Sequence, residues 1–160
     1  MVVAYDKHHA IGKGGERPWQ GGKLRADMKR FRDLTRDKTI IMGRRTFETD
    51  IGGHALPKRQ NIVLSRDTFS APDVITAHSL AEAYSLAAHD IVVIGGGQIY
   101  REALPDIDTI YATEIDGDID GDAFFPELPH AEWKEISREK YTASEGNLYD
   151  YSFVTYERIK

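Results

Sequence analysis

Asp27 is the residue whose position in this sequence most suggests acid chemistry. Apolar side chains recur around it at helical spacing, at Leu24, Met28, Phe31 and Leu34, so Asp27 falls on the apolar face of an expected helix. A carboxylate that faces an apolar surface is costly unless a partner pairs with it. Two interpretations follow: Asp27 complements the helix dipole from the first turn, or it is a buried acid that faces a cleft.

A glycine run after residues 91–94 could bind an anion. Four apolar residues are followed there by Gly95, Gly96 and Gly97, which let the backbone take positive φ and approach a ligand. Amides at the start of the next helix could hold a phosphate-type group. Tyr100 stands where the dinucleotide-binding pattern G-x-G-x-x-G needs its third glycine, so a structural turn without a ligand is the alternative.

Two arginines stand at a similar strand-to-helix junction. Arg44 and Arg45 follow the apolar run 39–42 and stand between Gly43 and Thr46 at an expected helix start. Guanidinium groups bind phosphate through paired hydrogen bonds, which the helix dipole reinforces. A solvated surface pair is the alternative.

An acidic segment suggests a function of a different class. From Asp116 to Glu127 the chain fits the calcium-loop pattern D-x-D-x-D-G-x5-E at every specified position. The preceding residues 110–115 are β-rich, however, and Pro126 and Pro129 interrupt the helix that a calcium-binding helix-loop-helix needs. A surface loop is the simpler interpretation, and because the histidines also lack ligand spacing we expect no metal site.

The elements that must position these residues indicate an α/β fold with a mixed sheet. Short apolar runs separated by helical patterns predict crossover units and largely parallel pairing. The later runs are longer, with no convincing helix between them, and predict antiparallel edge strands. Helices are expected over residues 24–35, after Gly43, and from a capping box at Ser79 and Glu82. Strands are expected over Val2–Tyr5, 39–42, 62–65, 74–76, 91–94, 108–115, Trp133–Tyr141 and 149–158.

Composition limits the functional class. The 160 residues suit one domain, 1–160, that can bury a core without metals or disulfides. A net charge of −5 argues against a sequence-independent nucleic-acid surface, and the absence of cysteine excludes thiolate chemistry. No apolar stretch reaches the length of a membrane span and no signal-peptide pattern is present. We therefore expect a cytoplasmic protein without nucleic-acid or membrane partners.

Several stretches stand in a characteristic order along the chain. They are Pro18-Trp19, 24–31, 41–48, 56–65, 93–100 and 121–126. In this order they resemble the chromosomal-type, bacterial-like dihydrofolate reductase family over essentially the whole chain. The resemblance implies a central, mostly parallel eight-stranded sheet with an antiparallel C-terminal edge strand, about four flanking helices and a monomer.

The resemblance also implies the reaction and the substrate side of the site. The family reduces 7,8-dihydrofolate to 5,6,7,8-tetrahydrofolate by hydride transfer from NADPH to the pterin, which supplies one-carbon metabolism and thymidylate synthesis. Asp27 matches the carboxylate that orients the pterin and promotes its protonation through water. Thr113 would support Asp27, Trp19 would fix a water, Tyr100 would lie near the nicotinamide, and Arg59 would pair with the glutamate tail. The other substrate positions implied are Val2, Ala4, Met28, Phe31, Arg32, Leu56 and Ile94.

On the cofactor side, the resemblance implies contact regions for the two ends of NADPH. The glycine turn would hold the pyrophosphate, with a cis peptide between Gly95 and Gly96, and Arg44 and Arg45 would form a second phosphate site. Ser65 and Arg66 lie where the adenosine 2′-phosphate is held, which favours NADPH over NADH. The cofactor positions implied are Ala4, Ile11, Gly12, Gly43, Arg44, Arg45, Thr46, Leu64, Ser65, Arg66, Ile94, Gly95, Gly96, Gly97, Gln98, Ile99 and Tyr100.

The chain departs from the family around the mobile loop at residues 11–19, which the segment with Gly121 and Asp122 should contact. Arg17 stands where a hydrophobic residue, often Leu or Met, is usual, and residues 20–23 lengthen the next connection. The segment 49–55 is also longer than usual. The resemblance therefore does not define how the loop closes or how the outer rim of the substrate site is built. The nearest enzymatic alternative is the riboflavin-pathway pyrimidine reductase of the same fold, against which Asp27 and Arg59 argue.

Overall fold

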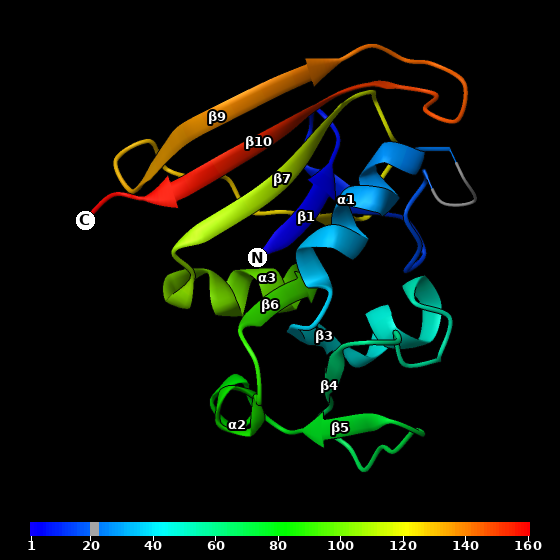
Figure 1. Cartoon of the computed structure of the whole chain (residues 1–160), viewed down its shortest axis with the longest axis vertical. Helices are drawn as coiled ribbons and strands as arrows, with labels where there is room; N and C mark the ends of the chain where they lie inside the picture. The colour runs from blue at the N-terminus through cyan, green and yellow to red at the C-terminus, as the bar shows by residue number, and fades with distance from the viewer. Residues whose placement is uncertain (20–22) are drawn as a thin grey trace.

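Two four-stranded sheets form the centre of the molecule in a computed structural model that describes residues 1–19 and 23–160 (Figure 1). Most of the longer connection at residues 20–23 thus lies outside the described residues. One sheet has the order β1-β7-β10-β9, and the other has the order β5-β4-β3-β6. The strands are β1 Val2–Tyr5, β3 Thr39–Gly43, β4 Gln60–Leu64, β5 Val74–Ala77, β6 Ile91–Gly95, β7 Thr109–Asp116, β9 Trp133–Tyr141 and β10 Asp150–Arg158.

The pairing directions confirm the mixed sheet predicted from the sequence. All pairs within β5-β4-β3-β6 are parallel, as is β1 with β7. The C-terminal strand β10 runs antiparallel to both β7 and β9, so it lies inside the sheet, and β9 rather than the expected C-terminal strand forms the edge. Strands β6 and β1 lie next to each other without a continuous ladder, so the eight expected strands are divided between two hydrogen-bonded sheets.

The Tyr100 side chain joins the two sheets at this junction. Its hydroxyl lies 2.9 Å from the carbonyl of Val2 in β1 and 2.8 Å from the carbonyl of Ile94 in β6, and it donates to these acceptors. The ring is 5 % exposed and belongs to the main core cluster. Tyr100 therefore holds together the strand ends that border the site.

The core explains why β3 carries an unbroken apolar run. Ile40, Ile41 and Met42 are completely buried, and alternate side chains enter two clusters on opposite faces of the sheet. Ile41 packs with Val93 on one face, whereas Ile40 and Met42 pack with Val63 on the other. A central parallel strand covered on both faces needs this pattern.

Helix α1 (Arg25–Thr35) begins without a side-chain cap of its own. Instead, the hairpin loop between β9 and β10 satisfies its first amides: Arg25 N–H donates to the Gly146 carbonyl and Ala26 N–H to the Asn147 Oδ1, both at 2.9 Å. Free amides at a helix start need such partners. The C-terminal hairpin thereby fixes the turn that carries Asp27.

The remaining helices include two corrections to the sequence expectations. The helix expected after Gly43 closes as the π-helical turn η1 (Thr46–Asp50), with Ile51 N–H donating to the Thr46 carbonyl at 3.0 Å. At helix α2 (Leu80–Leu86), Ser79 Oγ accepts from Glu82 N–H, but the Glu82 carboxylate accepts from His78 N–H rather than from Ser79. The other helical elements are α3 (Gly97–Ala103) and the 3-10 turn η2 (Leu104–Asp106).

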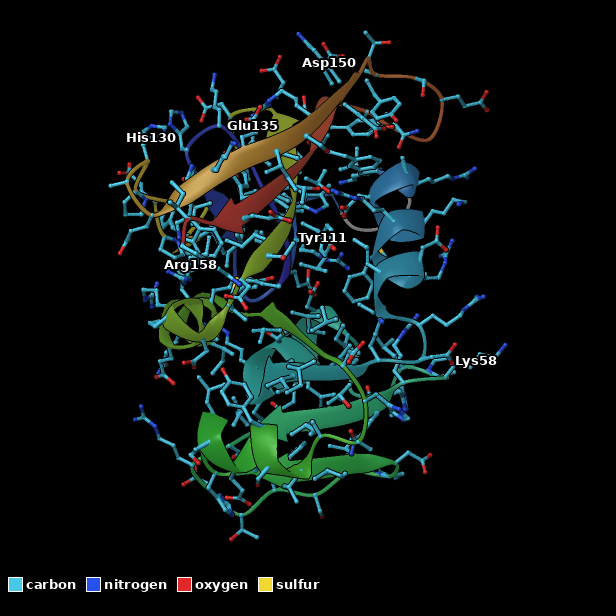
Figure 2. All side chains as sticks on the ribbon, turned by 60° about the vertical axis from the view of Figure 1, so that its left-hand side comes forward. Lys58, Tyr111, His130, Glu135, Asp150 and Arg158 are labelled. Carbon is cyan, nitrogen blue, oxygen red and sulfur yellow. The ribbon has the colours of Figure 1, made fainter. Side chains whose placement is uncertain are left out.

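The two ends of the molecule differ in exposure. Strand β9 is exposed at every position after Trp133, and its Glu135 lies at the outer side of the molecule in Figure 2. Charged side chains on an edge strand discourage pairing with another chain. Strand β5 and helix α2 lie at the opposite end (Figure 1).

No helix among the described residues combines the length and apolarity needed to cross a bilayer.

Candidate active site

A cleft of about 1080 Å³ contains most of the residues expected to do chemistry. It is bordered by α1, η1, the glycine turn and the ends of strands from both sheets. The expected site residues that line it are Val2, Ala4, Ile11, Gly12, Asp27, Met28, Phe31, Gly43, Arg44, Arg45, Thr46, Leu56, Leu64, Ser65, Arg66, Ile94, Gly96, Gly97, Gln98, Ile99 and Tyr100. Residues far apart in the sequence therefore share one cavity.

Asp27 is a buried acid that faces this cleft, which decides between the two interpretations of its position. Its carboxyl group is 6 % exposed, and the hydroxyl of Thr113 in β7 donates to its Oδ1 at 2.7 Å. Thr113 is itself buried and pairs in register with Ala4 of β1. Asp27 also stands in the first turn of α1, so the helix dipole acts on it as well.

Burial dominates the charge balance at this carboxyl. Desolvation raises the pKa of Asp27 above its ordinary value, against the hydrogen bond from Thr113 and the positive charges of Arg17 and Arg30, which lower it. The carboxylate of Asp50 adds a small increase. A carboxyl group with a raised pKa can retain a proton closer to neutral pH than a solvated one, which suits acid–base chemistry.

The glycine turn passes so close to its neighbours that an added Cβ would make tight contacts. The peptide between Gly95 and Gly96 is cis, as expected, and Gly95 has φ +122°. A Cβ on Gly96 would lie 3.0 Å from Thr46 Oγ1, and one on Gly95 would lie 3.1 Å from the ring of Tyr100. The backbone here forms a surface that a ligand can approach closely.

Basic side chains surround the far part of the cleft. Arg44 pairs with Glu48 at 2.6 Å and its guanidinium lies 4.7 Å above the ring of Phe69, while Arg45 and Arg66 also line the cavity. Planar guanidinium groups of this kind suit phosphate oxygens. The arrangement favours an anionic ligand with more than one phosphate-type group.

His78 also lines this part of the cleft, although we did not predict it from the sequence. Its Nδ1 lies 2.8 Å from the Ser65 carbonyl, next to Arg66. A signal was available, because β4 and β5 are parallel neighbours and the residues that follow them must meet at one edge.

Two other cleft residues, Asp50 and Ile51, come from the longer segment 49–55. The chain turns within this segment at Gly52 and Gly53, with φ of +85° and +77°.

Five expected residues lie outside the cleft wall. Trp19 is 2 % exposed, and its Nε1 is buried with no hydrogen-bond partner among the described residues. Thr113 stands behind Asp27, and Arg32 is exposed at the side of α1. Arg59 lies with its guanidinium 5.9 Å from the Phe31 ring, and its buried Nε has no partner within the described part of the chain. Gly95 also lies behind the wall, beneath Tyr100.

The acidic segment 116–127 contacts the loop at residues 11–19, as expected. Gly14 N–H donates to Asp122 Oδ2 at 3.0 Å, and Asp122 N–H donates to the Gly12 carbonyl at 2.9 Å. Two carboxylates of the calcium pattern have protein partners, since Asp120 pairs with Lys13 and Asp118 with His8. The loop also holds β8 (Ala123–Phe124) against β2 (Ala10–Gly12). Among the described residues, no three metal-ligating side chains are grouped to hold an ion.

Comparisons with known proteins give consistent results. The family model for dihydrofolate reductase matches residues 1–158. The dihydrofolate reductase of Haemophilus influenzae is 42 % identical over 161 residues, covering 99 % of this chain and 97 % of that protein. The enzyme of Staphylococcus haemolyticus is 39 % identical over 163 residues, covering 100 % and 95 %. A solved structure of dihydrofolate reductase from Enterococcus faecalis, complexed with NADP(H) and RAB-propyl, superposes with a TM-score of 0.89 at 34 % identity, covering 99 % of this chain and 95 % of that one.

Proposed function

Because the chain belongs to the dihydrofolate reductase family, we propose that it reduces 7,8-dihydrofolate to 5,6,7,8-tetrahydrofolate with NADPH. The observation that carries the proposal is the buried Asp27 carboxyl, fixed by Thr113 and facing the same cleft as the glycine turn. The relatives with this name and the neighbour solved with NADP(H) support the activity and the cofactor.

The cleft fits NADPH by the chemistry of its walls. Gly96 and Gly97 line the cleft without side chains, so their backbone can approach a pyrophosphate, and Arg44 and Arg45 add positive charge to the same cavity. Ser65 and Arg66 would hold the 2′-phosphate, with His78 beside them. When bound, NADPH supplies the hydride that the pterin receives.

We assign Asp27 the orientation of the pterin. Thr113 occupies Oδ1, whereas no hydrogen bond within the described part of the chain reaches Oδ2, so this oxygen can accept hydrogen bonds from the amino group and ring nitrogen of the substrate. A negative carboxylate in this position favours the protonated ring, and water would deliver the proton. Trp19, with its buried and unpartnered Nε1, would fix such a water.

The outer end of the cleft suits an acidic tail. Burial is the largest cause that lowers the pKa of Arg59, and the positive charges of Arg36 and Arg32 lower it further, so these three guanidinium groups lie within electrostatic reach of one another. A carboxylate would relieve their mutual repulsion and satisfy the buried Nε of Arg59. We propose that this group binds the glutamate tail of dihydrofolate, with Met28, Phe31 and Leu56 along the apolar part of the substrate.

We further propose that the enzyme acts as a monomer of one domain, residues 1–160, in the cytoplasm, and without nucleic acid. Its product would supply one-carbon metabolism and thymidylate synthesis. The riboflavin-pathway pyrimidine reductase is the enzymatic alternative, and its substrate carries no glutamate tail for Arg59. An assay of dihydrofolate-dependent oxidation of NADPH distinguishes the two activities.

Substitution of the carboxyl group tests the proposal. Asp27→Asn should lose roughly 10²- to 10⁴-fold of the dihydrofolate-dependent oxidation of NADPH near neutral pH. Part of the rate should return at acid pH, where the substrate is already protonated. Asp33→Asn, an exposed substitution on the same helix, serves as the control and should keep the wild-type rate. Full activity of Asp27→Asn at neutral pH would show that the assigned role is wrong.

A further inference from the structure

Arg17 and Asp50 form an ion pair inside the cleft, 33 residues apart in the sequence. Arg17 Nε lies 2.7 Å from Asp50 Oδ1, and both side chains line the cavity. Their side chains are 21 % and 17 % exposed, compared with 74 % and 59 % for the Lys29–Asp33 pair on α1. Among the ion pairs between described residues this one is the most buried.

The pair connects the mobile loop with two walls of the cleft. Asp50 is the last residue of η1, and Arg17 Nη1 donates to Met28 Sδ at 3.4 Å on α1. Met28 directly follows Asp27, so the guanidinium reaches the turn of helix that carries the reacting carboxyl. A long side chain held by two partners on different elements loses its freedom of movement, which fixes residue 17 relative to both walls.

The two charges act on the same groups in opposite directions. The positive charge of Arg17 lowers the pKa of Asp27, and the negative charge of Asp50 raises it, with burial as the larger cause. The same opposition holds for Tyr100. Burial is the largest cause that raises the pKa of Tyr100, the charge of Asp50 raises it further, and the charge of Arg17 lowers it. The pair therefore lies within electrostatic reach of the two groups that flank the reacting part of the cleft.

We propose that Arg17 and Asp50 are positioning residues for the reaction, a pair of opposite charges that fixes the loop at residues 11–19 while Asp50 offsets part of the effect of Arg17 on the Asp27 carboxyl. The inference rests on the proposed function, because it takes Asp27 to be the group that orients the pterin. An apolar residue at position 17 would contribute no charge to this site. An arginine there alone would hold Asp27 as an anion, and Asp50 offsets that effect.

Other groups also face Asp27 and stay constant in the test. Thr113 in β7 donates a hydrogen bond to it, and Arg30 contributes a positive charge from the next turn of α1. Tyr151 in β10 and Tyr100 in α3 interact with its charge. Because none of these is altered by substitution at positions 17 and 50, a change in the titration of Asp27 reports on the Arg17–Asp50 pair.

The test is a ¹³C NMR titration of the aspartate carboxyl carbons in the full-length protein, with Asp27→Asn to identify the signal of Asp27. We expect Arg17→Met to raise the titration midpoint of Asp27 by about one pH unit and Asp50→Asn to lower it by a smaller amount. The midpoint of the double variant should lie between those of the two single variants, since it removes both charges. Asp33→Asn is the matched control and should leave the midpoint unchanged, because its ion pair is exposed.

The direction of the Arg17→Met result separates electrostatics from a merely structural tether. Loss of a tether would admit water around Asp27 in both single variants, and since burial is the main cause of the raised pKa, both midpoints would fall. A fall in Arg17→Met, or no change in either single variant, would overturn the proposal. If Arg17→Met does not fold, Arg17→Gln removes the same charge and keeps the capacity to form hydrogen bonds. Arg17→Lys keeps the charge and should show the wild-type midpoint.

The titration needs no turnover, so its outcome is independent of the reaction assigned above. Opposite shifts without any dihydrofolate-dependent oxidation of NADPH would support the pair and contradict the proposed function. Activity with unmoved midpoints would support the function and contradict the pair. In an active enzyme, the midpoint of the pH profile for kcat should move in the same direction as the NMR midpoint in each variant.

Discussion

Asp27→Asn should make the protein more stable at neutral pH, although it disables the proposed chemistry. Burial raises the pKa of Asp27 in the folded state, so the unfolded chain releases this proton at a lower pH than the folded protein does. Stability is therefore lost as the pH rises from the unfolded pKa through the folded one. Asparagine has no proton to release and can still accept the hydrogen bond from Thr113.

The size of the effect follows from linkage. Each pH unit by which the folded pKa exceeds the unfolded one lowers the free energy of unfolding by about 1.4 kcal/mol above both pKa values. Single stabilising substitutions commonly raise the free energy of unfolding by about 0.5–2 kcal/mol, often with a loss of activity when they fall in an active site. We therefore expect Asp27→Asn to gain an amount in this range at pH 7 and to lose the gain below about pH 4, where Asp27 is protonated in both states.

Urea unfolding of both proteins between acid and neutral pH measures this difference. The matched control is Asp33→Asn, whose carboxylate has a pKa lowered by the hydrogen bond from Lys29, so its removal should give no gain at neutral pH. A wild-type protein more stable than Asp27→Asn at pH 7, or a difference independent of pH, would refute the assignment of a raised pKa.

Three further substitutions test individual contacts. Thr113→Val removes the donor to Asp27 Oδ1 and should lower the free energy of unfolding by about 1.5–3 kcal/mol, measured by urea unfolding; a loss within error would contradict the hydrogen bond. Gly96→Ala places a Cβ 3.0 Å from Thr46 Oγ1 and should weaken NADPH binding at least tenfold, about 1.4 kcal/mol, in a fluorescence titration. Arg59→Gln should raise the KM for dihydrofolate about tenfold or more with little change in kcat, whereas an unchanged KM would remove Arg59 from the substrate site.

The sequence predicts the elements that have a clear pattern of their own. Strand β3 could be recognised because a parallel strand covered on both faces needs an unbroken apolar run. Strands β2 and β8, with three and two residues, are too short to show a period. They exist because the acidic loop holds them together, and such contacts between distant segments leave no local signal.

The site was predictable in its parts but not in its arrangement. Spacing placed Asp27 on an apolar face, yet only the buried contact with Thr113, 86 residues away, distinguishes a cleft acid from a dipole partner. Arg17 was recognisable as an unusual residue, whereas its partner Asp50 is the last residue of η1, 33 residues further along the chain, and no local pattern connects the two. His78 enters the site through the parallel order of β4 and β5, which a search of single motifs does not consider.

The reaction itself is the central claim, and a steady-state assay of the purified protein tests it most directly. The protein is mixed with 7,8-dihydrofolate and NADPH, the loss of reduced cofactor is followed, and the same measurement is made with NADH. We predict oxidation of NADPH that depends on dihydrofolate, formation of tetrahydrofolate in equal amount, and a clear preference over NADH because of Ser65 and Arg66. Absence of dihydrofolate-dependent oxidation in a folded preparation that binds NADPH would contradict the assignment.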